Sequence, residues 1–514
     1  MAEKKPIDIQ VSQDPRASTG VDFIALGGIA LAVAVLHIAT NGRYGFHRDE
    51  LQVLDDARHM DWGFVVYPPV TPFIERIGLE LFGVSLVWLR MFSVLAQAAA
   101  LVVTGMMARE LGAGRLGQAA AALAVAVSPL PLFEGTEFQY STFDYLWSVL
   151  IAYFLIRLLK SGDARWWLGL GAGIGLGMMT KYTMAFFVAG IVAGVLLTPA
   201  RRYLKSPWLW CGAGLAVLIF LPNLIWQIRH GFISLHFLQH IHARDVGEGR
   251  ANGFVRDQFM ISTNPFLAPL WFAGLFYYFG ATDGKRYRLL GWLYVVPLAL
   301  FLFAKGRGYY LAPTYPMLFA AGSVLWERWV KSISTAWSRV VRGVTFAAIA
   351  TGGVLACAFI VPIDPVISAN NFGIRNNGDL REEIGFTDLV AAVAKVRDSL
   401  TPAERSNFAI ITGNYGETGA IDLYGAAYSL PPAISGTNSA WFRGYGNPAP
   451  VVLIVVGQSR EDAERMFESC RLAGHNGNPY GIDNEENREH PDIFVCGPPR
   501  EPWPEFWKDF QAYG

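Results

Sequence analysis

A dense run of ionisable side chains follows the first long apolar stretch of the chain. His47, Arg48, Asp49 and Glu50 are consecutive. Three more acidic residues follow shortly afterwards, namely Asp55, Asp56 and Asp61. A carboxylate within hydrogen-bond reach of a hydroxyl can act as a general base. The alternative is that Asp49 and Glu50 cap a helix, because a helix N-terminus stabilises carboxylates. The residue types leave both interpretations open.

Histidines in the segment 228–264 are a second candidate for chemistry. His236 and His240 would share one face of a helix, and His242 follows closely, so the spacing could suit a metal ion. Asp245 is the nearest acidic residue, and no neighbouring carboxylate or cysteine completes a convincing ligand set. We therefore expect a binding or lid loop here and no metal site.

The composition determines what kind of molecule must hold these groups. The chain has 514 residues, 42 Lys and Arg against 42 Asp and Glu, 53% hydrophobic residues and 16% charged residues. A soluble domain is about 25% charged. The zero net charge argues against a nucleic-acid partner, and four cysteines exclude a disulfide-dense scaffold. The composition predicts a membrane protein.

Apolar segments long enough to cross a bilayer recur along the chain. A helical span needs about 20 mostly apolar residues. Lys181 and Tyr182 alone separate the short fifth and sixth segments, which predicts a tight hairpin or two tilted helices. Eleven segments qualify: 22–40, 86–107, 116–133, 140–158, 166–180, 183–199, 209–228, 265–281, 289–304, 309–326 and 343–362.

Loop charges predict the orientation of these spans. Short cytoplasmic loops carry an excess of Lys and Arg. Lys4, Lys5 and Arg16 place the N-terminal tail, residues 1–21, in the cytoplasm, and every second loop is then short and basic. The first outer loop, 41–85, would begin as an amphipathic helix in the membrane interface. An odd number of spans places residues 363–514 outside.

The outside segment changes to the pattern of a small α/β domain. A helix is predicted near Thr387, buried strands over 407–412 and 451–456, and a helix over 460–470. Gly413–Gly419 would form an ordinary strand-to-helix turn, because it lacks a phosphate-binding motif. Two cysteines, Cys470 and Cys496, could be free buried thiols or a disulfide, and we favour the disulfide.

Three motifs together resemble a known group of enzymes. They are FHRDELQVLDDARHMDWGFVVYPPVTPF at 46–73, Lys181-Tyr182, and KGRGYYLAPTYPM at 305–317. The first resembles the first extracytoplasmic loop of bacterial membrane glycosyltransferases of the GT-C class, the protein-O-mannosyltransferase-like and aminoarabinose-transferase-like enzymes. The resemblance implies a mainly α-helical polytopic GT-C domain over 22–362 in the inner membrane and a periplasmic α/β domain over 363–514.

The resemblance also implies a reaction. A sugar would move, with inversion, from a polyprenyl-phosphate-linked donor to a lipid, glycan or protein acceptor on the periplasmic face. Asp49 matches the catalytic aspartate of the family, and Glu50 is its neighbour. Asp144 matches a further acidic position and would hold a sugar or orient Asp49, unless it only stabilises a helix start. The resembling enzymes imply no metal and no cofactor.

The leaving phosphate would need cations on the outer side. Lys305 and Arg307 lie in a predicted outer loop, against the orientation rule, and with Tyr309 and Tyr310 they would clamp the donor phosphate. Their alternative role is to anchor the chain at the membrane surface. Two further predicted substrate-binding residues are Lys181 and Tyr67.

Two other classes of membrane protein remain as alternatives. A flippase for polyprenyl-linked sugars, or another transporter, would also need many spans and intramembrane charges, although transporters favour related halves and broken helices. A non-catalytic assembly subunit would not depend on Asp49 or Lys305. The sequence predicts contact with membrane lipids, but it does not predict the oligomeric state, the sugar or the acceptor.

Overall fold

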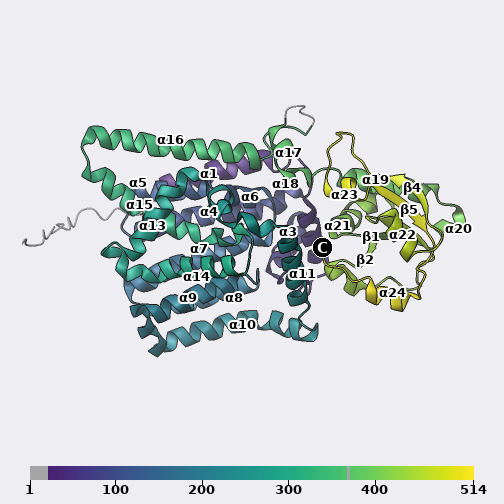
Figure 1. Ribbon diagram of the computed structural model, residues 1–514, viewed down its shortest axis with the longest axis horizontal. Coiled ribbons are helices and arrows are strands. Elements are labelled where there is room, and N and C mark those ends of the chain that lie inside the picture. The colour runs from purple at the N-terminus through teal and green to yellow at the C-terminus, as the bar shows by residue number, and fades with distance from the viewer. Residues whose placement is uncertain (1–20, 367–370) are drawn as a thin grey trace, which may run out of the picture.

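The computed structural model describes residues 21–366 and 371–514, so nearly all of the predicted N-terminal tail, including Lys4, Lys5 and Arg16, lies outside the described residues. Helices dominate up to residue 366, and one five-stranded sheet lies in the last part of the chain (Figure 1). We call residues 21–366 the helical unit and residues 371–514 the C-terminal unit. The two units pack against each other end to end (Figure 1).

Six helices of the described chain are long and apolar enough to cross a membrane. They are α1 (Phe23–Thr40), α4 (Leu86–Glu110), α7 (Tyr140–Ser161), α10 (Pro207–Arg229), α14 (Arg288–Phe303, counted from Asp283) and α16 (Thr335–Ile360). Three bent pairs raise the number to nine if each pair is one span. These pairs are α5 (Arg115–Ala126) with α6 (Pro129–Thr136), α9 (Met184–Leu197) with η1 (Pro199–Lys205), and the helical residues 250–262 with 265–279, which include α13 (Ala268–Phe279).

The predicted count of eleven spans is therefore not confirmed, although helices occur at all eleven predicted positions. Two physical reasons account for the difference. The helix α8 (Trp166–Met178) is short, and α15 (Tyr315–Ser332) carries Glu327, Arg328 and Lys331 in its last turns. A proline at or next to the start of the second helix accompanies each bend, because proline cannot continue the hydrogen-bond ladder.

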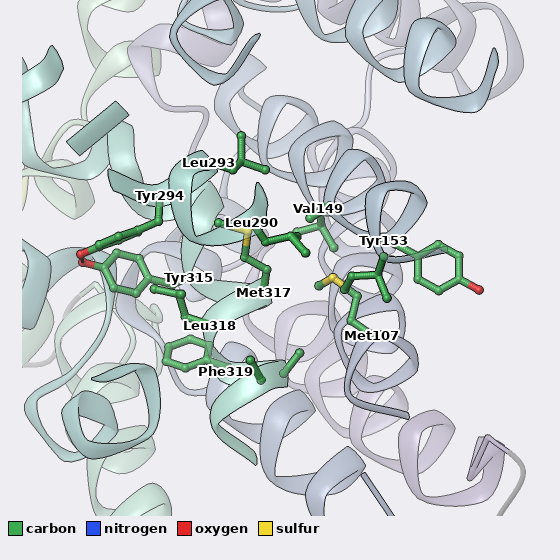
Figure 2. Packing of buried hydrophobic residues seen from close by; sticks show 14 of the residues in the cluster. Met107, Val149, Tyr153, Leu290, Leu293, Tyr294, Tyr315, Met317, Leu318 and Phe319 are labelled. Carbon is green, nitrogen blue, oxygen red and sulfur yellow. Dashed lines mark hydrogen bonds between the residues drawn. The ribbon is translucent and has the colours of Figure 1, made fainter. Parts of the chain in front are cut away.

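Close contact of small residues holds the peripheral helices, and larger side chains fill the centre. A Cβ atom at Gly171 of α8 would lie 2.1 Å from the carbonyl oxygen of Gly212 on α10, so these two helices touch through their backbones. In the centre, Met317 of α15 packs near Met107 of α4, and Phe319 belongs to the same buried cluster (Figure 2). The helical unit is thus a packed bundle whose ends near the C-terminal unit carry the irregular segments.

Three helices lie between the bundle and the sheet: α2 (Arg48–Arg58), α3 (Val70–Phe82) and α11 (Ile233–Gly247) (Figure 1). The sequence predicts α2 as an interfacial helix with a solvated polar face. The helix is present, but its polar face is buried as well, with Asp55 6% and Asp56 2% exposed. The cause is contact with α21 (Tyr415–Tyr424) of the C-terminal unit, where a Cβ at Gly419 would lie 2.6 Å from the Leu51 carbonyl oxygen.

The C-terminal unit is a small α/β structure, as predicted. Its strand order is β2-β1-β3-β5-β4, and the first three strands are parallel. The strands are β1 (Phe408–Thr412), β2 (Ala433–Ser435), β3 (Val452–Val456), β4 (Arg471–His475) and β5 (Asp492–Cys496). Its longer helices are α19 (Phe386–Ser399), α21, α22 (Arg460–Met466) and α24 (Trp503–Asp509). A disulfide joins Cys470 and Cys496, which confirms that prediction.

A buried ion network joins the two units. Arg90 of α4 donates to both carboxylate oxygens of Glu50 at 2.8 and 2.7 Å and to Glu383 of the C-terminal unit at 3.3 Å. Two carbonyl oxygens, those of Asn41 and Gly45, accept its remaining bonds at 2.9 and 3.0 Å. The side chains of the arginine and both glutamates are completely buried. This network fixes the start of α2 relative to both units.

We expect Arg90→Met to destabilise the protein by about 3–5 kcal/mol, because it leaves two buried carboxylates without their counter-charge. Thermal or denaturant unfolding of the purified protein in detergent measures the loss. Arg76→Met is the matched control, since the exposed Arg76–Glu80 pair should contribute about 0–1 kcal/mol. Equal stability of the two variants would contradict the structural role of the network.

Candidate functional site

A cavity of about 460 Å³ lies where the helical unit meets the C-terminal unit. Its wall combines the first turn of α2, the start of α9, the end of α14, one face of α11 and the first residue of α21. The wall contains charged and aromatic groups together with apolar side chains such as Phe186 and Phe301. Six predicted site residues line it together: Asp49, Tyr67, Lys181, Lys305, Arg307 and Tyr310.

Asp49 lies in the first turn of α2, where the helix N-terminus stabilises its charge. His47 is the N-cap residue, and its ring nitrogen Nδ1 accepts a hydrogen bond from the Asp49 backbone amide at 3.2 Å. The Tyr415 hydroxyl donates to Asp49 Oδ1 at 2.8 Å, and the same hydroxyl accepts from Arg48 Nε at 2.9 Å. The carboxylate is therefore held by both units of the chain.

Glu50 does not share the cavity with Asp49. Its carboxylate completes the capping box by accepting from the His47 backbone amide at 2.9 Å, and its main partner is Arg90. Glu50 thus serves as the helix cap that the sequence left as the alternative, and its catalytic role stays a prediction. The guanidinium of Arg90 on α4 neutralises this carboxylate in the protein interior.

Asp144 lies beside the main cavity and not in its wall. Its side chain is 6% exposed and borders a small adjoining hollow with Thr183 and Tyr310. Among the described residues, its Oδ1 atom has no hydrogen-bond partner. Glu134 and Glu137 lie in the short loop between two predicted spans, where the sequence predicts solvated side chains. They are 4% and 0% exposed, so that prediction is wrong.

Arg307 is already held by a carboxylate. Its Nε and Nη2 atoms donate to the two oxygens of Asp245 at 2.5 and 2.8 Å in a bidentate pair. Asp245 is buried on α11, so the pair joins α11 to the segment after α14. Lys305 lies nearby, is exposed and adopts a left-handed backbone conformation with φ 50°. Lys305 and Arg307 therefore both line the cavity, where Asp245 fixes the guanidinium of Arg307. Their role as a phosphate clamp stays a prediction.

Lys181 contacts aromatic rings instead of a carboxylate. Its ammonium lies 5.1, 5.3 and 5.0 Å from the ring centroids of Tyr140, Tyr309 and Tyr310. Lys181 is 9% exposed. Within the described part of the chain, its ammonium forms no ion pair. Tyrosine faces attract a cation without neutralising its charge. This ammonium can therefore attract an anion in the cavity.

Tyr67 belongs to a second network that joins the two units. Its hydroxyl donates to Asp56 Oδ2 at 2.8 Å, while Arg443 of the C-terminal unit donates to both oxygens of Asp55 at 2.9 and 2.6 Å. Burial and the charge of Asp55 raise the pKa of Asp56 to about 7. Burial and Asp55 likewise raise the pKa of Asp422 to about 6. The guanidinium of Arg443 thus lies within ion-pair distance of three carboxylates, those of Asp55, Asp56 and Asp422.

Tyr415 lines the cavity although the sequence does not predict it as a site residue, and His242 and Asp245 line it from the segment 228–264. His242 lies in the segment predicted as a binding or lid loop, and the described residues contain no group of three His, Cys, Asp or Glu side chains that could hold a metal. Tyr415 follows Asn414, the N-cap of α21, in the turn predicted as an ordinary strand-to-helix connection. No spacing in the sequence marks it.

Comparison with known protein sequences points to membrane glycosyltransferases. Residues 66–226 match the family described as dolichyl-phosphate-mannose-protein mannosyltransferase. The lipid A galacturonosyltransferase RgtD of Rhizobium johnstonii is 28% identical over 256 residues, which are 48% of this chain and 53% of RgtD. The lipopolysaccharide core galacturonosyltransferase RgtB of the same organism is 28% identical over 185 residues, 35% of this chain and 37% of RgtB. The matches thus span about half of the length of the first relative and less of the second.

Solved structures share the fold over most of the chain. ArnT from Cupriavidus metallidurans, bound to undecaprenyl phosphate, has a TM-score of 0.59 at 15% identity, covering 92% of this chain and 97% of ArnT. The arabinofuranosyltransferase AftD from Mycobacteria has a TM-score of 0.55 at 15% identity, covering 93% of this chain and 40% of AftD. The chain has the GT-C fold of multi-pass membrane proteins, as its sequence motifs implied.

We expect the thermal midpoint of unfolding to fall as pH rises from about 5 to about 8, and Asp56→Asn to weaken this dependence. The pKa values of Asp56 and Asp422 lie above their ordinary value of 3.8, at about 7 and about 6. At pH values between 3.8 and the raised pKa values, the folded protein binds more protons than the unfolded chain. The folded state therefore loses stability as the two carboxyl groups ionise. Thermal unfolding across this pH range measures the slope.

The control for this experiment is Asp398→Asn, which changes an exposed carboxylate of the C-terminal unit and should keep the wild-type slope. An unchanged slope in the Asp56→Asn variant would show that this carboxyl group does not control the pH dependence.

Proposed function

We propose that this chain is an inverting glycosyltransferase of the bacterial inner membrane that uses a polyprenyl-phosphate-linked sugar on the periplasmic face. The observation that carries the proposal is one cavity with a carboxylate, Asp49, and an ammonium, Lys181, in its wall, and this ammonium has no ion pair within residues 21–366 and 371–514. A base and a phosphate-binding cation are what such a transfer needs. The undecaprenyl phosphate bound to ArnT, which shares the fold, supports the choice of donor.

In the proposed reaction the Asp49 carboxylate accepts the proton of the acceptor hydroxyl. The acceptor oxygen forms its bond to the anomeric carbon from the face opposite the phosphate, and the bond between that carbon and the phosphate oxygen breaks. The phosphate leaves with the electron pair. Lys181, Lys305 and Arg307 stabilise the negative charge that develops on it.

The wall of the cavity suits both ends of such a donor. Apolar side chains from α9, α11 and α14 would contact the first isoprene units, whereas the cationic part would hold the phosphate; these apolar residues are Phe186, Leu238, Ile241 and Phe301. The basic groups outnumber what one phosphate needs, since Arg244 and His242 also line the cavity. We propose a hexuronic acid as the transferred sugar and a lipid A or lipopolysaccharide glycan as the acceptor, in line with the names of RgtD and RgtB.

We expect Asp49→Asn to reduce sugar transfer by at least about 10²-fold, because the amide cannot accept the proton. The assay uses the full chain in lipid nanodiscs, radiolabelled undecaprenyl-phosphate-linked galacturonic acid, mannose and aminoarabinose, and a lipopolysaccharide-containing lipid extract. Label that moves to a new chromatographic species identifies the sugar and the acceptor class together. Asp61→Asn, an exposed position of the same loop, should retain wild-type transfer.

Two results would contradict this proposal. Full activity of Asp49→Asn would remove Asp49 as the base. Tight binding of every donor without any transfer by the wild type would favour a polyprenyl-sugar flippase, and a vesicle translocation assay would then measure that activity.

Arg307→Lys should raise the KM for the donor about 10-fold, with a smaller change in kcat. Lysine keeps the charge but cannot form the bidentate pair with Asp245, so the cation loses its fixed position. Steady-state kinetics with varied donor concentration measure the effect, and binding of undecaprenyl phosphate should weaken in parallel. Arg256→Lys, at a side chain 78% exposed, is the control. An unchanged donor KM would place the phosphate elsewhere in the cavity.

A further inference from the structure

We infer that Tyr415 of the C-terminal unit is a positioning residue for Asp49, so that the C-terminal unit completes the active site. This inference rests on the proposed function, because it assigns a role within the proposed transfer. Tyr415 lies more than 300 positions from Asp49 in the chain and reaches it through α21, which packs on α2.

The hydrogen bonds of Tyr415 have only one consistent direction. Arg48 Nε can only donate, so the phenol oxygen is the acceptor of the 2.9 Å bond between them. The single phenol proton is then available for Asp49 Oδ1 at 2.8 Å. Burial and the neighbouring Asp49 raise the pKa of Tyr415, which keeps the hydroxyl protonated and able to donate. The three residues form a directional chain from Arg48 to Tyr415 to Asp49.

Arg48 is itself held on the C-terminal unit. Its guanidinium lies 4.8 Å from the centroid of the Tyr415 ring and forms an ion pair with Glu485 of α23 (Glu485–Glu489). Two interactions of different kinds therefore fix this side chain against one part of the fold. A fixed arginine cannot turn its Nε–H away, so the phenol proton keeps its direction toward Asp49.

Two glycines allow α21 to come close enough for this contact. A Cβ atom at Gly416 would lie 3.0 Å from the Arg48 Cβ atom, and one at Gly419 would lie 2.6 Å from the Leu51 carbonyl oxygen. Any larger side chain at Gly419 would push α21 away from α2, because the opposing atom is backbone. The first residue of α21 is Tyr415, so the same packing that joins the helices brings its hydroxyl to Asp49.

The bond leaves Asp49 with one committed oxygen. Oδ1 accepts from Tyr415, and Oδ2 is the atom that would take the proton of the acceptor hydroxyl. A carboxylate fixed through one oxygen presents the other in a constant direction, which lowers the cost of reaching the reactive geometry. The effect belongs to the chemical step, and it should therefore change kcat more than KM.

The first test compares Tyr415→Phe with Tyr424→Phe, a matched change on the same helix outside the cavity. We expect Tyr415→Phe to lower kcat about 10- to 100-fold, the effect of losing a hydrogen bond to a charged group. The KM values for donor and acceptor and the thermal midpoint should stay close to wild type. The probe is the radiolabelled undecaprenyl-phosphate sugar of the panel that the wild type consumes. A wild-type kcat, or a loss explained by unfolding or by KM, would overturn the inference.

The second test asks whether Arg48 acts through Tyr415. Arg48→Met keeps the aliphatic stem but removes the donor, and we expect it to lower kcat as well. If the two residues act in one chain, the double variant with Tyr415→Phe should be little worse than the more damaged single variant. Effects that simply multiply would contradict the directional chain.

The third test does not depend on turnover. A water-soluble carbodiimide with a nucleophilic amine labels accessible carboxyl groups, and mass spectrometry measures the labelling of Asp49. Tyr415→Phe should increase that rate several-fold relative to wild type and to Tyr424→Phe, and an equal rate would overturn the inference.

Asp49→Asn separates the two proposals: if it abolishes transfer while Tyr415→Phe changes neither kcat nor labelling, only the positioning role fails. If Asp49→Asn retains transfer while labelling responds to Tyr415→Phe, the contact exists and the proposed base fails.

Discussion

The burial of Arg90 is the constraint on which the rest of the structure depends. A guanidinium without solvent is tolerated only when carboxylates and carbonyl oxygens surround it, and here Glu50 and Glu383 supply the charges. Because those glutamates come from the start of α2 and from the C-terminal unit, satisfying one arginine fixes three parts of the chain together. Asp49 precedes Glu50 and inherits this fixed position, so a structural ion network determines where a cavity carboxylate lies.

Much of the fold could be predicted from the sequence, because apolar runs and strand patterns are local properties. Helices occur at all predicted positions, and two strands of the C-terminal unit, β1 and β3, and its disulfide were predicted. The number of spans could not be predicted in the same way, since hydropathy does not reveal bends such as that between α5 and α6. The burial of Glu134, Glu137 and the polar face of α2 was also missed, because it depends on partners far away in the chain.

In the candidate site, too, local properties could be predicted from the sequence and long-range contacts could not. The outer-rim cations and Asp49 could be selected from residue type and from resemblance, and they do line one cavity. The contacts that each of these side chains makes could not be predicted from residue type or from resemblance. Arg307 pairs with Asp245, Lys181 lies among tyrosine rings, and Tyr415 binds Asp49. Each of these contacts joins segments that only the tertiary packing brings together, and several motif residues turned out to hold the site instead of forming its wall.

The aromatic surroundings of Lys181 have a consequence for the end of a catalytic cycle. Rings do not neutralise the positive charge of the ammonium, and the nearby carboxyl groups of Glu134 and Asp144 do not contact it within ion-pair distance in the described part of the chain. The cavity therefore keeps its attraction for anions whether or not a sugar is attached to them. The lipid phosphate that remains after transfer would meet the same attraction as the loaded carrier. Departure of the spent carrier would then compete with entry of the next one, and ionic strength would affect turnover through release as well as through capture.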